Sequence, residues 1–186
     1  MIKELVKKNR SYRRFYQEKK LTRQQLMELV ETARLPPSAA NRQPFKYRIV
    51  CDEEENEKVF RLLGFAGYLK DWDGPSEGEK PTGYIVITCP ANVNDEVDAG
   101  IVGQTMLLAA TEAGFGGCFF GHVKRDELKT QLNIPSELKI VYVIAFGYPK
   151  EEVVLEDIPA DGDIKYYRDE NQVHHVPKKR IEDIVL

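Results

Sequence analysis

Residues 98–121 read DAGIVGQTMLLAATEAGFGGCFFG, and this stretch decides the fold. From about residue 99 to residue 113 almost every helical face is apolar, which is typical of a helix buried at the centre of a domain. Asp98 stands where an N-cap would lie, and Gly114 stands where the left-handed glycine after a helix would lie. The sequence therefore predicts one central helix that is followed by a glycine-rich turn.

Buried strands precede and follow this helix in the sequence. Tyr84–Thr88 is a continuous run dominated by β-branched residues, and Ile140–Phe146 is fully apolar, so both are predicted as strands with two covered faces. Lys46–Val50 is a third predicted strand. Interleaved helices and strands favour the α/β or the α+β class.

Helices of ordinary amphipathic character fill the rest of the first half. Thr22 and Gln25 have the spacing of a capping box, and an apolar series at helical spacing follows them. That helix must stop before Pro36-Pro37, because proline cannot continue a helix. The other predicted elements are a helix at 2–9, an acidic turn at 52–57, a helix from 57 to about 63, a loop or short helix at 64–83, and a helix at 124–132.

The composition is that of a globular protein. The chain has 186 residues, of which 42% are hydrophobic and 31% charged, so we expect residues 1–186 to form a single domain. The formal net charge of −3 argues against a general nucleic-acid binder. Residues 1–23 carry nine basic and two acidic side chains, a net charge of +7, which leaves −10 on the remainder. A basic arm favours an anionic partner, although a solvated amphipathic helix is the simpler explanation from charge alone.

The cysteines and the apolar runs bear on the compartment. Cys51, Cys89 and Cys118 are scattered and have no C-x-x-C spacing, so we expect reduced thiols rather than disulfides. The first residues lack the apolar core and cleavage site of a signal peptide, and no apolar run reaches about 18 residues. We therefore expect a cytoplasmic protein that does not enter a membrane.

Several common catalytic and binding motifs are absent. The chain contains no P-loop, because the nearest approach to one, Gly116 to Gly121, is followed by His122 in place of the lysine. It also contains no complete G-x-G-x-x-G. It also lacks H-E-x-x-H and G-x-S-x-G. His122, His174 and His175 have no partner at metal-ligand spacing, and adjacent residues on a strand point in opposite directions, so we expect no metal site.

Three segments remain that an ordinary domain does not require. The guanidinium groups and the serine hydroxyl that lie close together in Arg10–Phe15 suit a phosphate, with a surface turn as the alternative. Small residues in Pro37–Phe45 let backbone amides approach a flat ligand, with a helix-to-strand turn as the alternative. Glycines in Gly114–Gly121 let backbone N–H groups approach a ligand, with a C-cap and buried strand as the alternative.

Taken in order, these segments resemble the flavin-dependent nitroreductase superfamily in its compact form. Further matching segments are Asp98-Ala99-Gly100, Ile144–Pro149 and Val176–Arg180. The resemblance implies an α+β fold, a three-layer α/β/α sandwich with a mainly antiparallel central sheet. It also implies an intertwined homodimer in which both chains contribute to each site.

The resemblance further implies that the chain binds FMN. The residues expected at the ribityl phosphate are Arg10, Ser11, Arg13, Lys178 and Arg180. The residues expected along the ring and ribityl chain, from the other subunit, are Pro37, Ser38, Ala39, Asn41 and Gln43. Gly116 and Gly117 are expected to offer backbone N–H groups near the reactive flavin nitrogen, while the hydride chemistry belongs to the cofactor.

The implied reaction is a ping-pong hydride transfer. NAD(P)H reduces FMN and leaves, and a nitroaromatic, quinone or similar small acceptor then takes its place. No protein acid or base is nominated. Tyr68, Lys70 and Trp72 are placed on the substrate side by their position in the 64–83 loop. The sequence departs from the family where Ala39 replaces a second serine and Phe45 replaces the commoner tryptophan, and it has no cysteine cluster for an iron–sulfur domain.

Two other functions stay open at this point. A non-catalytic flavin-binding or storage protein would bind FMN but turn over slowly with both nicotinamides. An acidic domain with a basic arm for RNA or DNA would bind with strong salt dependence. The glycine and proline segments favour the flavin enzyme, because a general nucleic-acid patch does not need them.

Overall fold

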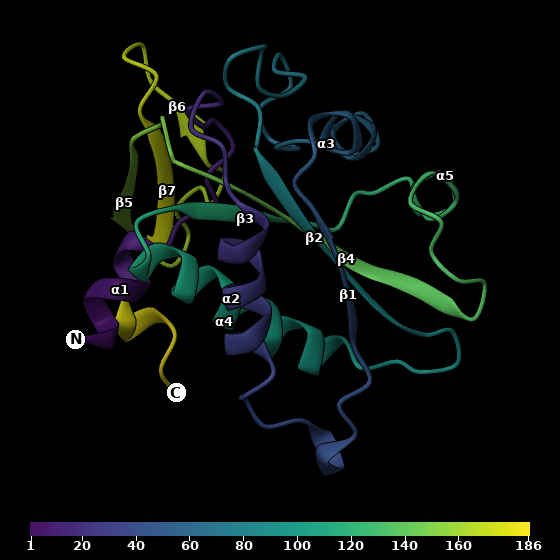
Figure 1. The fold of residues 1–186 in the computed structure, drawn as a ribbon. Coiled ribbons are helices and arrows are strands. Elements are labelled where there is room, and N and C mark those ends of the chain that lie inside the picture. Colours follow the sequence, from purple (N-terminus) through teal and green to yellow (C-terminus); the bar gives the residue numbers. More distant parts are fainter.

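Four strands form the central sheet in the order β1-β2-β4-β3, and each neighbouring pair is antiparallel (Figure 1). This computed structural model describes residues 1–186, and the strands are β1 Lys46–Val50, β2 Gly83–Pro90, β3 Gly116–Phe120 and β4 Leu138–Gly147. The predicted strands are confirmed. The two most apolar strands, β2 and β4, take the central positions because both of their faces are covered.

Helices cover both faces of this sheet. Figure 1 shows α2 (Arg23–Ala33) and α4 (Glu96–Glu112) on one face, with α3 (Glu53–Phe60) and α5 (Arg125–Gln131) on the other. Each face encloses its own hydrophobic cluster. The predicted three-layer α/β/α sandwich with an antiparallel central sheet is therefore confirmed.

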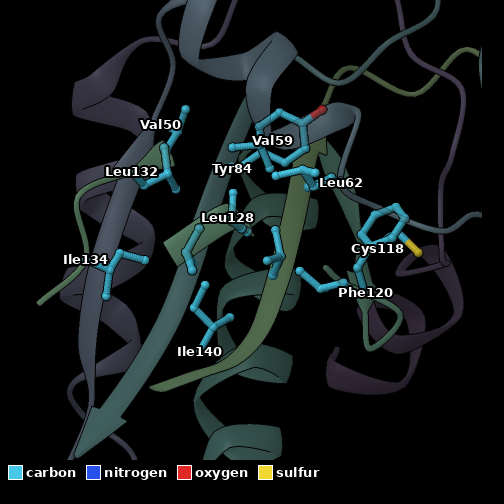
Figure 2. Close-up of a cluster of buried hydrophobic side chains, with 14 of the residues drawn as sticks. Val50, Val59, Leu62, Tyr84, Cys118, Phe120, Leu128, Leu132, Ile134 and Ile140 are labelled. Atoms are coloured by element: carbon cyan, nitrogen blue, oxygen red, sulfur yellow. The ribbon is translucent and has the colours of Figure 1, made fainter. Parts of the chain in front are cut away.

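The alternation of side chains along β2 separates the two clusters. Tyr84 and Val86 belong to the cluster beneath α3 and α5, whereas Ile85 and Ile87 belong to the cluster beneath α2 and α4. Figure 2 shows the first cluster, in which Tyr84 lies among side chains from α3, α5 and β3. All four of these β2 residues are fully buried. Both faces of β2 therefore pack against a hydrophobic cluster.

The helix ends follow local capping. The capping box of α2 is confirmed, since Thr22 Oγ1 accepts from Gln25 N at 3.2 Å and Gln25 Oε1 accepts from Thr22 N at 2.9 Å. The predicted acidic turn at 52–57 is wrong. Asp52 is the N-cap of α3, and the acidic residues after it form the first helical turn, where carboxylates are stabilised by the helix dipole.

The central helix α4 follows the predicted course, except at its start. Gly114 adopts the left-handed conformation with φ of +86° directly after it, as predicted. The N-cap is Asp95 and not Asp98, which lies in the first turn of the helix. The Asp98 carboxylate instead accepts hydrogen bonds from Ser38 and Ala39, which lie outside the helix.

A second, smaller sheet contains the C-terminal strands, which the sequence did not predict. Its order is β5-β7-β6, with β5 and β7 parallel and β6 antiparallel to β7. The bounds are β5 Val153–Ile158, β6 Tyr167–Arg168 and β7 His174–Lys179. The remaining elements are α1 Ile2–Lys8 and two 3-10 turns, η1 Ala39–Asn41 and η2 Ile181–Asp183. None of the helices combines the length and apolar character needed to cross a bilayer.

Candidate functional site

The N-terminal arm, residues 10–16, lies against the ends of β3 and β4. Tyr12 N donates to the carbonyl of Gly117 at 3.1 Å, and Ser11 forms an isolated parallel bridge with the same glycine. The fully buried ring of Phe15 packs on Gly147, where a Cβ atom would lie 2.7 Å from that ring. The structure thus brings together the arginine segment and the glycine segment that the sequence singled out.

Two arginines of the arm have no carboxylate partner. Arg10 donates from Nη2 to a carbonyl of α1 at 2.8 Å, while its Nε is buried without any partner. Burial lowers the pKa of Arg10. Arg13 donates to the carbonyl of Ser11 at 3.2 Å, lies 3.4 Å from Nε2 of His174, and stacks 5.1 Å above the ring of Tyr166. Both guanidinium groups therefore keep unused capacity for an anion.

The third arginine of the arm is fully engaged. Arg14 donates to both carboxylate oxygens of Glu79, at 2.6 and 2.7 Å, and Lys150 approaches the same carboxylate at 2.9 Å. The hydrogen bond from Arg14, together with that from Lys150, lowers the pKa of Glu79 to about 2. Arg14 therefore fastens the arm through a carboxylate, which neither Arg10 nor Arg13 does.

The Pro37–Phe45 loop is held in place by Asp98. The carboxylate oxygen Oδ2 accepts from Ser38 Oγ at 2.7 Å and from Ala39 N at 2.9 Å. These bonds, first that of Ser38 and then that of Ala39, lower the pKa of Asp98. Ser38 Oγ in turn accepts from Gln43 N at 3.0 Å. Asp98 thus anchors the loop to α4 instead of capping the helix.

The same loop contains three non-glycine residues in the left-handed region: Ala40 with φ of 50°, Asn41 with φ of 52° and Gln43 with φ of 47°. Such residues are uncommon and persist where their surroundings enforce them. Gln43 Nε2 helps by donating to Asn41 Oδ1 at 2.9 Å. Beside the loop lies a pocket of about 180 Å³, lined by Pro37, Ser38, Gln43, Phe45, Tyr47 and Val102, among others.

The arm and the loop lie at opposite ends of α4 (Figure 1). The loop is bonded to Asp98 in the first turn, whereas the arm lies beyond the last turn, which ends at Glu112. Fourteen helical residues separate those two positions, a rise of about 21 Å. One chain therefore does not bring these two groups of predicted residues together.

Gly116 and Gly117 have a packing reason to be glycine. They lie buried in β3, where a Cβ on Gly117 would be 2.2 Å from the backbone oxygen of Ala145, and a Cβ on Gly116 would be 2.7 Å from the ring of Tyr12. A side chain at either position would force a neighbouring group to shift, whatever binds nearby. Their expected role as donors to a flavin stays a prediction. Gly121, just beyond β3, is exposed.

The basic residues of the tail do not lie beside Arg13. Lys178 is at the end of β7, four residues beyond His174, which is the strand's contact with Arg13. Four strand residues span about 13 Å. Lys178 and Arg180 are exposed. The structure does not join them to Arg13 within one chain, and their phosphate role stays a prediction.

Two of the residues expected on the substrate side lie near the arm. The ring of Tyr68 packs 5.0 Å from that of Tyr166, and the ring of Trp72 lies 4.1 Å from the Arg168 guanidinium. Lys70 is exposed. Residues 64–82, called the 64–82 loop from here on, form neither helix nor strand.

Four residues near the arm were missed by the sequence analysis: Glu151, Tyr166, Arg168 and His174 as a neighbour of Arg13. All come from the second sheet or from the segment leading into it. The apolar run Val153-Val154-Leu155, with two β-branched residues, was the available signal for that sheet. No pattern in the sequence indicates which residue of the arm they contact.

The adjacent histidines of β7 point in opposite directions, as expected for a strand. His174 is 1% exposed, and burial, followed by the charges of Arg13 and Arg168, lowers its pKa to about 4. His175 Nδ1 lies 2.5 Å from Glu156 Oε1, and its Nε2 lies 3.4 Å from Asp169 Oδ2. Burial opposes protonation of His175, but the two carboxylates raise its pKa.

Comparison with known proteins agrees with this architecture. The sequence profile of the nitroreductase family matches residues 6–64 and 82–148. An Archaeoglobus fulgidus protein, named as a candidate NADH dehydrogenase/NAD(P)H nitroreductase, is 27% identical over 150 residues, which cover 75% of this chain and 80% of that protein.

Two solved structures share the fold. A nitroreductase family protein from Clostridium novyi NT has a TM-score of 0.68 at 24% identity, covering 81% of this chain and 86% of that one. An FMN-dependent nitroreductase from Clostridium difficile R20291 has a TM-score of 0.64 at 23% identity, covering 82% of this chain and 89% of that one.

Proposed function

The chain belongs to the nitroreductase family, and from that membership we propose that it is an FMN-dependent oxidoreductase. The reductant is NADH or NADPH, and the acceptor is a small molecule such as a nitroaromatic or a quinone. The names of the similar archaeal protein and of the clostridial structure support the nicotinamide and the flavin, respectively. Reduction and reoxidation alternate at one site, which makes the reaction ping-pong.

The observation that carries this proposal is the pair of arm arginines, Arg10 and Arg13, that have no carboxylate partner. Arg10 Nε is a buried donor without a partner, which costs about 1–3 kcal/mol. A phosphate oxygen would satisfy that donor, and Ser11, an exposed residue with a hydroxyl group, lies between the two arginines in the sequence. Arg13 offers further donors to the same anion. This donor set fits the phosphate of FMN.

A site shared by two copies of the chain follows from the separation of arm and loop. About 21 Å of helix lies between them, so we propose that the loop of one chain faces the arm of its partner. Exposed apolar residues near the loop support such a homodimer, since Val97 is 78% exposed, Ile101 36% and Leu35 66%. In this arrangement, burying them would accompany assembly of the site.

The chain's own contribution is to bind and orient, while bound FMN supplies the capacity to accept and donate hydride. Arg10, Ser11 and Arg13 hold the phosphate. Ser38 and Asn41 contact the ring and ribityl chain, and the small side chain of Ala39 lets the backbone approach. We assign no proton transfer to a protein side chain.

The test is the visible absorption spectrum of the purified protein, with mass identification of any released chromophore. Two flavin bands and released FMN are expected, followed by NAD(P)H oxidation that depends on an added quinone or nitroaromatic. A colourless protein that takes up no added FMN would refute the proposal. Bound FMN without acceptor-dependent turnover would favour a flavin-binding or storage role instead.

A further inference from the structure

Glu151 is a buried carboxylate that fixes the backbone of the arm. Its side chain has no exposed surface, and one oxygen accepts from the backbone N–H groups of Arg13 and Arg14, the latter at 3.2 Å. The other oxygen accepts from Arg168 Nη2 at 3.1 Å. A buried carboxylate is tolerated only where donors satisfy it, and here a guanidinium and two successive backbone groups do so.

Arg168 extends this link to the 64–82 loop. Its side chain is 9% exposed, and its guanidinium lies 4.1 Å from the centre of the Trp72 ring. Trp72 packs edge-on against Phe65, and Phe65 packs against Phe120 of β3. The arm, Glu151, Arg168 and Trp72 therefore form one continuous series of contacts. The contact between the Arg168 guanidinium and the face of the Trp72 ring is a favourable cation–π interaction.

A second series runs parallel to the first. The guanidinium of Arg13 lies 5.1 Å above the Tyr166 ring, and the centre of the Tyr68 ring lies 5.0 Å from the centre of the Tyr166 ring. Tyr68 N also donates to the Tyr166 hydroxyl at 3.4 Å. Both series pass through Tyr166–Arg168, which lies between the arm and the loop. Tyr68 and Trp72 in the first half of the loop therefore contact this short segment, whereas Glu79 near the loop's end is bonded directly to Arg14.

We propose that Glu151 and Arg168 are positioning residues that couple the phosphate-binding arm to the 64–82 loop. The inference rests on the proposed function, because it takes the arm as the FMN phosphate site and the loop as the substrate side. A phosphate on Arg10 and Arg13 restrains the arm, and Glu151 and Arg168 pass that restraint to Trp72. Coupling is reciprocal, so docking of the loop also strengthens FMN binding.

The experiment measures tryptic cleavage after the exposed Lys70 with and without FMN. In the unaltered protein we expect FMN to slow cleavage at least about fivefold, the lower end of ordinary coupling between two sites. In Glu151→Gln and Arg168→Gln we expect less than about twofold protection, and FMN affinity about tenfold weaker. Glu156→Gln is the matched control, since this carboxylate lies in the same sheet and contacts His175 and Tyr167 but not the arm.

Steady-state kinetics supply a second measurement. At saturating FMN we expect both variants to raise KM for the acceptor more than they lower kcat, because the loop is displaced while the cofactor stays bound. A purely structural role would lower thermal stability without changing FMN protection of Lys70. If Glu151→Gln fails to fold, Arg168→Gln tests the same link from its other end, and Arg168→Lys should restore little, since lysine lacks the planar fork.

The outcomes separate this inference from its premise. Equal FMN protection of Lys70 in the unaltered protein, Glu151→Gln and Arg168→Gln would overturn the coupling while the proposed function stands. Failure of the unaltered protein to bind FMN would overturn both. Loss of protection in Glu156→Gln to the same extent would also overturn the coupling, because any damage to the second sheet would then suffice.

Discussion

Replacing His174 with glutamine is expected to reduce the loss of folding stability that the protein suffers as the pH falls below 6.5. His174 is 1% exposed, and its Nε2 lies 3.4 Å from Arg13 Nη1. Burial and the nearby arginines lower its pKa from 6.5 to about 4. The unfolded chain therefore binds a proton between those two pH values, while the folded chain does not. Stability is fully present above pH 6.5 and falls as the pH drops toward 4.

The magnitude follows from the same shift. Each unit of pKa difference corresponds to about 1.4 kcal/mol, so His174 contributes on the order of 3 kcal/mol that disappears between pH 6.5 and pH 4. Urea unfolding of the unaltered protein and His174→Gln at intervals from pH 4.5 to 7.5 measures it. The free energy of unfolding should fall less steeply with acid in the variant, because glutamine does not titrate.

His175→Gln provides a control of opposite sign. Burial opposes its protonation, but Glu156 and Asp169 raise the pKa of His175, so its contribution is present below pH 6.5 and lost as the pH rises through the folded value. This variant should lose stability mainly at the acid end. Parallel profiles for the unaltered protein and His174→Gln between pH 4.5 and 6.5 would refute the reasoning.

Three further predictions concern the arm and the loop. Gly117→Ala should lower the free energy of unfolding by at least about 1–3 kcal/mol, because its Cβ would meet a backbone oxygen of β4 at 2.2 Å. Gly67→Ala, with open space around it, should be near neutral, and thermal melts of both variants measure the difference. Asp98→Ala should cost about 1.5–3 kcal/mol in urea unfolding and weaken FMN binding, since two charge-assisted bonds to the loop are lost; unchanged FMN affinity would contradict a cofactor role for the loop. Arg10→Ala combined with Arg13→Ala should give a folded, mostly colourless protein by circular dichroism and absorption, and full flavin occupancy would remove the phosphate assignment.

Continuous apolar character made the central strands predictable. Tyr84–Thr88 and Ile140–Phe146 are covered on both faces, so their sequence reflects their position directly. The turn after α4 was equally clear, because Gly114 supplies a conformation that few other residues adopt. Local chemistry of this kind is visible in a sequence.

Side chains that act across the fold were not predictable. Asp98 looks like an N-cap, but its partners Ser38 and Ala39 are about 60 residues away and become neighbours only when the loop folds onto α4. Glu151 is one of many carboxylates in an acidic protein, and its burial against the arm becomes visible only in the folded chain. The acidic start of α3 was mistaken for a turn because consecutive glutamates favour a helix mainly through its dipole.

The arm also affects the tendency of the chain to aggregate through the edge of its central sheet. β3 lies at the border of the central sheet, where unpaired backbone groups can pair with a strand of another molecule. Tyr12 and Ser11 occupy that border at Gly117. Whatever loosens the arm, including loss of an anion from Arg10 and Arg13, exposes the unpaired backbone groups of the edge strand β3. Cofactor supply during synthesis would then influence how much of the protein aggregates as well as how much is active.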